Sequence, residues 1–182
     1  MSDAPIIRFS TFPRTRVPPS FIKDVVEVFQ TNCGQIGTNP QKKGLTSDEM
    51  LAVLRDDLTN LGFHVEASKL AKDKIRRPVF FGENARPYLQ YELDAWHPDW
   101  RAGLEIEAGR AWMGNAIYRD LIQALVMVET DHLFLAVPNG YRYMSGGRQV
   151  TSRDYEHTVT VADALYAHSR IDMPYSLCVI GY

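Results

Sequence analysis

Two short runs of alternating acidic and aliphatic residues constrain the fold more than any other part of the sequence. They are Tyr91-Glu92-Leu93-Asp94 and Leu104-Glu105-Ile106-Glu107. On a β-strand, successive side chains point to opposite faces, so the acids of each run point to one face and Leu93, Leu104 and Ile106 to the other. Both runs are therefore predicted to be strands with one apolar and one acidic face.

The segment between the two runs, residues 95–103, has the composition of a hairpin connection, because it contains Pro98-Asp99 and Gly103. Asp94 and Glu105 are 11 residues apart, and their midpoint falls inside this turn. A symmetric hairpin places the two carboxylates opposite each other, close enough to hold a divalent cation. Without a cation, the two charges repel each other.

Length and composition predict a single globular domain over residues 1–182, with residues 1–19 as an extended arm. The hydrophobic content of 45% is enough for a core, and 23% of the residues are charged. The formal net charge of −2 is a mild argument against a nucleic-acid-binding protein. It is not decisive, since acids around a metal can offset basic residues elsewhere.

The sequence shows neither the pattern of a membrane-spanning or secreted protein nor that of a cysteine metal site. The sequence has no apolar run of transmembrane length, and its N-terminus lacks a basic segment followed by an apolar one. We therefore expect a soluble, cytoplasmic protein that binds no membrane. The two cysteines, Cys33 and Cys178, lack metal-ligand spacing and are assigned no chemical role.

The periodicity of apolar residues predicts the remaining elements. Helices are expected near residues 21–30, 46–61, 110–129 and 155–168, and strands near 63–67, 79–81, 88–94, 103–107, 132–137 and 175–180. A crossover helix joins the strands at 103–107 and 132–137, so these two strands are predicted to be parallel. The basic segment 69–77 is expected to be a solvated crossing and residues 138–147 an exposed loop.

The order of these elements, with Asp94 on one strand and Glu105-Ile106-Glu107 on the next, resembles the PD-(D/E)XK nuclease superfamily. Residues 103–110, Tyr118-Arg119-Asp120-Leu121 and residues 133–138 resemble type II restriction endonucleases of the BglII and BamHI kind. The resemblance covers about a third of the chain and departs from the usual pattern twice. No proline precedes the aspartate, and a glutamate replaces the usual lysine, as it does in the BamHI-like variant.

This resemblance implies an α/β fold of the restriction-endonuclease-like type. Its mixed sheet combines an antiparallel meander with a crossover helix and a parallel strand, and helices flank the sheet. The implied activity is hydrolysis of phosphodiester bonds in double-stranded DNA with Mg²⁺ or Mn²⁺. A homodimer is expected, because symmetric cleavage of a duplex requires two active centres and one small domain supplies one.

Phosphodiester hydrolysis needs a hard cation with oxygen ligands. The candidate metal ligands are Asp94, Glu105 and the main-chain carbonyl of Ile106, and the candidate catalytic residues are Asp94, Glu105 and Glu107. Glu107 shares a strand face with Glu105 and could act as a base or as a further ligand. By the resemblance, Glu49 is a candidate outer-shell carboxylate.

Arg110 and Arg119 lie on the helix after the acids and are the candidate DNA-binding residues. They could meet phosphates or simply neutralise Glu105 and Glu107. Two alternatives stay open: a non-catalytic member of the same fold that acts as a binding or assembly protein with solvated acids, and a small-molecule-binding protein that uses residues 138–147. Convergence of the three acids in a cleft would separate these readings.

Overall fold

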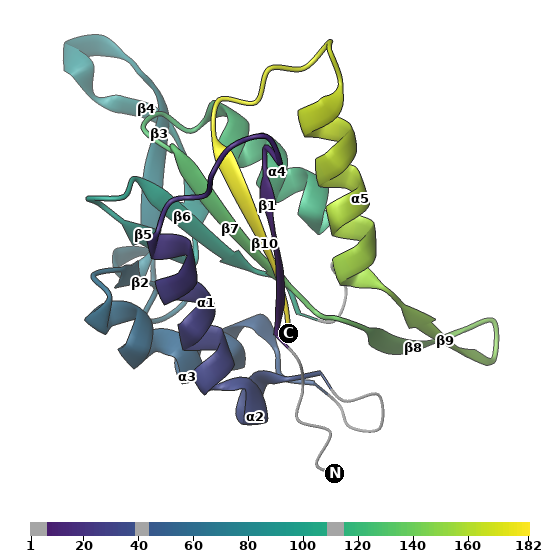
Figure 1. Ribbon diagram of the computed structural model, residues 1–182. Helices are drawn as coiled ribbons and strands as arrows, with labels where there is room; N and C mark the ends of the chain where they lie inside the picture. The colour runs from purple at the N-terminus through teal and green to yellow at the C-terminus, as the bar shows by residue number, and fades with distance from the viewer. Residues whose placement is uncertain (1–6, 39–43, 109–114) are drawn as a thin grey trace.

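Six strands form the central sheet in the computed structural model, which describes residues 7–38, 44–108 and 115–182. Their order is β1-β10-β7-β6-β5-β2 (Figure 1). The strands are β1 (Arg8–Phe12), β2 (His64–Val65), β5 (Ala95–His97), β6 (Ala102–Ile106), β7 (His132–Val137) and β10 (Ser176–Gly181). The strands β6, β7 and β10 are parallel, and the others pair antiparallel. The predicted parallel alignment of β6 and β7 is therefore confirmed.

Helices cover both faces of this sheet (Figure 1). They are α1 (Phe21–Thr31), α2 (Cys33–Ile36), α3 (Ser47–Asn60), α4 (Ala116–Val126) and α5 (Asp154–Ala167). One core, which includes Phe29 and Leu54, lies between the sheet and α1, α2 and α3. A second core, which includes Ile117 and Ala162, lies between the sheet and the helices α4 and α5. The chain is thus a three-layer mixed α/β structure.

The strand β7 contributes to both cores. Leu133, Leu135 and Val137 belong to the core under α4 and α5, whereas Phe134 and Ala136 belong to the core under α1 and α3. Because successive side chains point to opposite faces, a strand between two helical layers must be apolar on both. This requirement explains the uninterrupted apolar run that predicted the strand.

Two antiparallel ribbons lie outside the central sheet (Figure 1). One pairs β3 (Ile75–Phe81) with β4 (Pro87–Leu93), and the other pairs β8 (Tyr141–Ser145) with β9 (Arg148–Ser152). Two short 3₁₀ turns, η1 (Ala71–Asp73) and η2 (Glu83–Ala85), flank β3. The first ribbon corrects one expectation, since the basic segment predicted as a crossing already forms strand from Ile75 onward.

The second ribbon corrects the prediction of an exposed loop at residues 138–147. Gly146 and Gly147 have φ angles of +57° and +76°, a conformation that L-residues with side chains adopt rarely. Two successive positive φ angles are what a tight two-residue hairpin turn requires. The glycine pair therefore closes a hairpin, and the residues on either side pair as strands.

Residues 8–12, expected to belong to an extended arm, form the edge strand β1 instead. They pair antiparallel with β10, and Phe12 is buried. Two arginines of this region are tied to α5, because Arg8 pairs with Glu156 and Arg14 with Asp163. The N-terminal segment is therefore part of the sheet and of the α5 layer.

The strand β6 shows how the fold separates acidic from apolar residues. Leu104 and Ile106 belong to the core under α1 and α3, so Glu105 between them points to the α4 face, as predicted. The prediction for Leu93 is wrong, because this residue packs in the core under α4. The chain bends between β4 and β5, and Gly103 leaves room for the displaced side chain. A Cβ atom at Gly103 would lie 3.1 Å from Leu93 Cδ1.

The helix predicted at residues 110–129 is observed as α4, which ends at Val126. Its expected first turn, residues 110–113, lies outside the described residues. Within the described part of the chain, no helix is long and apolar enough to cross a membrane.

The capping box of α3 generates a stability prediction. Thr46 Oγ1 accepts a hydrogen bond from the Glu49 N–H, and the Glu49 carboxylate accepts one from the Thr46 N–H. We expect Thr46→Ala to lower the free energy of unfolding by about 1 kcal/mol, because an orphaned N–H loses its partner. Chemical denaturation measures the change. The control Thr59→Ala, at an exposed site of the same helix, should change it by less than about 0.5 kcal/mol, and equal losses in both variants would contradict the prediction.

Candidate functional site

The hairpin of β5 and β6 sets the position of the two central carboxylates. Its register pairs Ala95 with Leu104 and Trp96 with Gly103, so one further step places Asp94 opposite Glu105. The main-chain N–H of Ile106 donates a hydrogen bond to Asp94 Oδ2, at 2.7 Å. The predicted register of the hairpin is therefore confirmed, and a side-chain bond across it fixes the Asp94 carboxylate.

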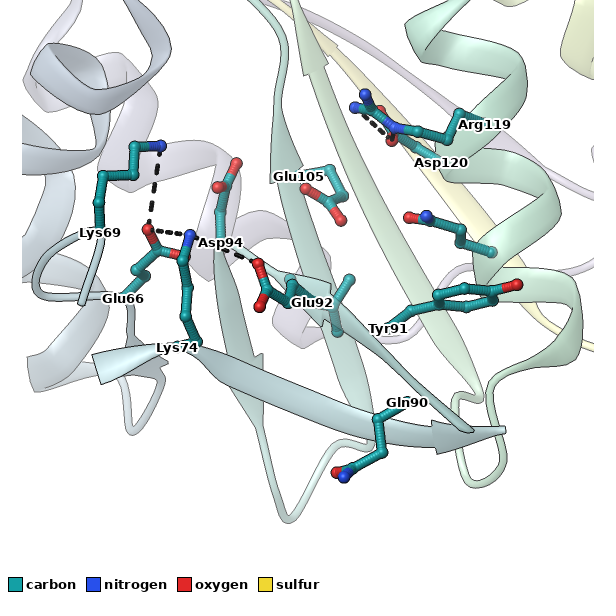
Figure 2. Close-up of a pocket in the computed structure, with 12 residues that line it drawn as sticks. Glu66, Lys69, Lys74, Gln90, Tyr91, Glu92, Asp94, Glu105, Arg119 and Asp120 are labelled. Atoms are coloured by element: carbon teal, nitrogen blue, oxygen red, sulfur yellow. Dashed lines mark hydrogen bonds and ion pairs between the residues drawn. The ribbon is translucent and has the colours of Figure 1, made fainter. Parts of the chain in front are cut away.

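Both carboxylates open into a cavity of about 540 Å³. Figure 2 shows Asp94 on one side of this cavity, Asp120 and Arg119 on the other, and Glu105 between them. The lining residues come from the segment before β3, from β4, β6 and α4: Glu66, Lys69, Lys74, Gln90, Tyr91, Glu92, Leu93, Asp94, Glu105, Arg119, Asp120 and Gln123. Acids from each of these parts of the chain thus converge on one space.

Burial controls the ionisation of the two opposed acids. Burial raises the pKa of Asp94 to about 6, and the negative charges of Glu66 and Asp120 raise it further. The hydrogen bond from the Ile106 N–H stabilises the ionised carboxylate and acts in the opposite direction. Burial also raises the pKa of Glu105 well above its usual value, and the charge of Asp94 raises it further. Each carboxylate therefore makes the ionisation of the other more costly.

Glu107 lies at the end of β6, beside α4. Arg119 Nη2 donates to Glu107 Oε1 at 2.9 Å, and the Tyr182 hydroxyl donates to the Glu107 carbonyl at 2.8 Å. Burial raises the pKa of Glu107 to about 8, and so does the charge of Asp120, with which protonated Glu107 shares a hydrogen bond. Glu107 therefore contacts Arg119 and Asp120 of α4 but does not line the cavity.

Asp120 is a site residue to which the sequence analysis assigned no role. It is 1% exposed, and Arg119 donates to its Oδ1 at 2.9 Å. No amide, guanidinium or hydroxyl group of the described residues donates to Oδ2, which is buried. Its position gives a signal that could have found it, since it lies between Ile117 and Leu121 on the buried stripe of α4. A charged residue on such a stripe needs a buried partner or a ligand.

Glu66 and Lys74 form a second unpredicted feature, on the opposite wall of the cavity. Lys74 Nζ donates to both carboxylate oxygens of Glu66, at 2.8 and 2.9 Å, and Glu66 is 6% exposed. The Glu66 N–H also donates to the main-chain oxygen of Asp94 at 2.8 Å. This pair therefore anchors the bend that carries Asp94 and places one cation next to the acids.

The other predicted site residues are placed as follows. Glu49 closes the capping box of α3 and does not line the cavity, so its outer-shell role stays a prediction. Arg119 lines the cavity and pairs with Glu107 and Asp120. Arg110 lies outside the described residues.

The donor set suits a hard cation. The acids at the cavity offer carboxylate oxygens as metal ligands. When Glu107 is ionised, the buried Asp120 Oδ2 has no hydrogen-bond donor among the described residues, and a bound cation would satisfy it. Within the described ranges, no three Asp, Glu, His or Cys side chains are close enough together to form a complete metal site. Mg²⁺ requires less than that, because it commonly binds one or two carboxylates and fills the remaining positions with water and substrate phosphate.

Comparison with known proteins supports the fold. No protein-family model matches the sequence, and no curated protein sequence matches it. In structure, the chain is similar to the crystal structure of the restriction endonuclease BglII complexed with a DNA 16-mer, with a TM-score of 0.57 and 9% sequence identity. The match covers 97% of this chain and 77% of that one. The chain therefore has a restriction-endonuclease-like fold, as its sequence predicted.

The raised pKa values generate a prediction about pH. Asp94 and Glu107 have folded pKa values of about 6 and about 8, against ordinary values of 3.8 and 4.5. Between about pH 4 and pH 8 these two groups therefore bind more protons in the folded protein than in the unfolded chain, and their contribution to the free energy of unfolding should fall as the pH rises. Denaturation without divalent metal should show this decline, and the double variant Asp94→Asn/Glu107→Gln should flatten it.

The matched control is Glu27→Gln, which removes an exposed acid on α1. It should leave the pH dependence of stability unchanged. A double variant with the same slope as the wild-type protein would show that neither carboxyl group titrates as the structure indicates.

Proposed function

We propose that this protein is a Mg²⁺- or Mn²⁺-dependent endonuclease that hydrolyses phosphodiester bonds in double-stranded DNA, as type II restriction enzymes do. One observation carries the proposal: Asp94 and Glu105 face each other across the β5–β6 hairpin at an open cavity, in a restriction-endonuclease-like fold. Two desolvated carboxylates in that position repel each other, and a bound cation would remove the repulsion.

In this proposal Asp94, Glu105 and the carbonyl of Ile106 hold the metal ion. A divalent cation there polarises a phosphoryl oxygen and lowers the pKa of a bound water. Because Asp94 Oδ2 already accepts the Ile106 N–H, its carboxylate is held in one orientation before any cation binds. Such preorganisation lowers the cost of assembling the site.

Glu107 is the proposed base. From its place beside the metal ligands Glu105 and Ile106, it would accept the proton of the attacking water on its carboxylate. Arg119 holds the Glu107 side chain at 2.9 Å and can also meet a phosphate, because 58% of its side chain is exposed. Arg110 remains a proposed phosphate contact on the basis of its sequence position.

The proposal includes a homodimer. The outer side of α4 carries Tyr118, Ile122 and Val126 at four-residue intervals, and their exposed fractions are 43%, 56% and 41%. An exposed apolar stripe on a helix suits contact with a second copy of the chain. A dimer would bring two active centres to the two strands of a duplex.

One observation favours a second candidate function, that of a non-catalytic member of this fold that acts as a binding or assembly protein. Arg119 pairs with both Glu107 and Asp120, so part of the acidic charge is already neutralised within the protein. In such a protein the acids would not need a cation. Metal binding and DNA cleavage therefore distinguish the two functions.

The first test measures metal binding through stability. A ligand that binds only the folded state raises its stability, by about 2.7 kcal/mol at a hundred times its Kd. We expect Mg²⁺, Mn²⁺ or Ca²⁺ to raise the Tm of the wild-type protein and of Glu27→Gln, and the double variant Asp94→Asn/Glu105→Gln to lose this response. An equal Tm shift in the double variant would exclude a metal site at the hairpin.

The second test measures nicking of supercoiled plasmid with Mg²⁺ or Mn²⁺. Glu107→Gln should reduce cleavage about 10²- to 10⁴-fold, because a positioned base contributes that much to rate, while DNA binding in Ca²⁺ stays nearly unchanged. Glu107→Lys restores the residue more common in the resembling family and should retain some activity with altered metal preference. Folded, metal-binding wild-type protein that nicks no DNA of mixed sequence would overturn the catalytic function and favour the binding protein.

A further inference from the structure

The ribbon of β8 and β9 is basic and contains no acid. Residues 138–153 include three arginines and no Asp or Glu, in a chain whose net charge is −2. Among the residues that the structure describes, neither Arg142 nor Arg148 forms an ion pair, whereas Arg77 and Arg119 both pair with glutamates. The positive charge of the ribbon is therefore available to an external anion.

The register of the ribbon sorts its side chains into two faces. Arg142 lies opposite Thr151, and Met144 lies opposite Gln149. Paired residues on neighbouring strands point to the same face, and so do residues two positions apart on one strand. The side chains of Arg142, Met144, Gln149 and Thr151 therefore lie on one face of the ribbon. All four are exposed. We call this surface of Arg142, Met144, Gln149 and Thr151 the Arg142 face.

The opposite face of the ribbon is different in character. It carries Tyr141 and Tyr143, which are half-buried and stack with their ring centroids 6.3 Å apart. Ser152, paired with Tyr141, is half-buried as well. The tyrosine face is thus partly covered, which leaves the Arg142 face as the fully exposed side of the ribbon.

The ribbon leaves the sheet at the carboxyl end of β7, next to the end of β6 that carries Glu105. Ile106 pairs with Ala136 in the parallel strands β6 and β7, and the Glu107 N–H donates to the Ala136 oxygen at 2.9 Å. The chain leaves β7 at Val137 and enters β8 at Tyr141. Figure 1 shows the ribbon projecting from that end of the sheet. A duplex bound at the acids would therefore lie beside the start of the ribbon.

We propose that the Arg142 face enters the major groove of duplex DNA and reads base edges there, an inference that rests on the proposed endonuclease function. The major groove is wide enough for a two-stranded ribbon. Its residue types match direct base readout: the Arg142 guanidinium suits guanine O6 and N7, the Gln149 amide suits adenine N6 and N7, and the Thr151 methyl group suits the thymine methyl group. Arg148 projects from the other face and contacts phosphate.

The experiment selects preferred sequences from a random duplex library, with Ca²⁺ in place of Mg²⁺, and measures affinity for each base at each position. Arg142→Lys keeps the charge but loses bidentate geometry, so it should reduce preference at one base pair about 10- to 100-fold. Gln149→Ala should do the same at a different base pair. Arg148→Ala should weaken all sequences equally and reduce the salt dependence of binding by about one phosphate contact.

The control is Arg170→Ala, an exposed arginine in the segment between α5 and β10, which Figure 1 places at the other end of α5 from the ribbon. It should leave base preference and affinity unchanged. Wild-type base preference in both Arg142→Lys and Gln149→Ala would overturn the readout by the ribbon, and wild-type protein that binds no duplex would overturn it too. Failure of the nuclease function alone has a different signature, in which DNA is bound selectively and the ribbon variants change the preference, but plasmid is never nicked.

Discussion

Asp94 and Glu105 repel each other electrostatically, and the surrounding structure must hold them together against this repulsion. The two carboxylates cannot move apart along the hairpin, because a slip of one residue would exchange Glu105 with the apolar Leu104 between the cavity and the core. Burial makes both charges costly, and it raises both pKa values. Cations of the protein lie to either side, Lys74 on one wall and Arg119 on the other. The fold thus holds two acids of like charge together at a cavity that is open to solvent.

The parts of the site that the sequence predicted are those determined by near neighbours in the chain. The pairing of Asp94 with Glu105 follows from an acid at each end of a short turn, and the burial of β7 follows from one uninterrupted apolar run. The start of α3, predicted near residue 46 and observed at Ser47, is likewise determined within one helical turn, because Thr46 and Glu49 form a capping box there. In each case the competing conformations differ over a few residues, so pattern and turn chemistry decide between them.

The parts that the sequence did not predict depend on contacts between distant elements. Asp120 belongs to the site only because the folded chain brings its charge close to Glu105. Glu66 belongs to it only because Lys74, eight residues later, pairs with it. Leu93 changes face because Gly103, on a different strand, leaves a space for it. The alternation of side chains along a strand predicts only which residues of that strand share a face, so it cannot predict the space that a glycine on another strand leaves.

The position of β10 in the sheet has a consequence for biosynthesis. This strand lies between β1 and β7, although residues 8–12 of β1 and residues 132–137 of β7 are both synthesised before residues 176–181. While the chain emerges from the ribosome, β1 has no partner in the sheet and β7 has an open edge until these residues arrive. The hairpin with the acids is made much earlier, but the sheet that supports it is completed only by this late strand. Assembly of the site is therefore coupled to completion of the sheet, which cannot occur before residues 176–181 have been synthesised.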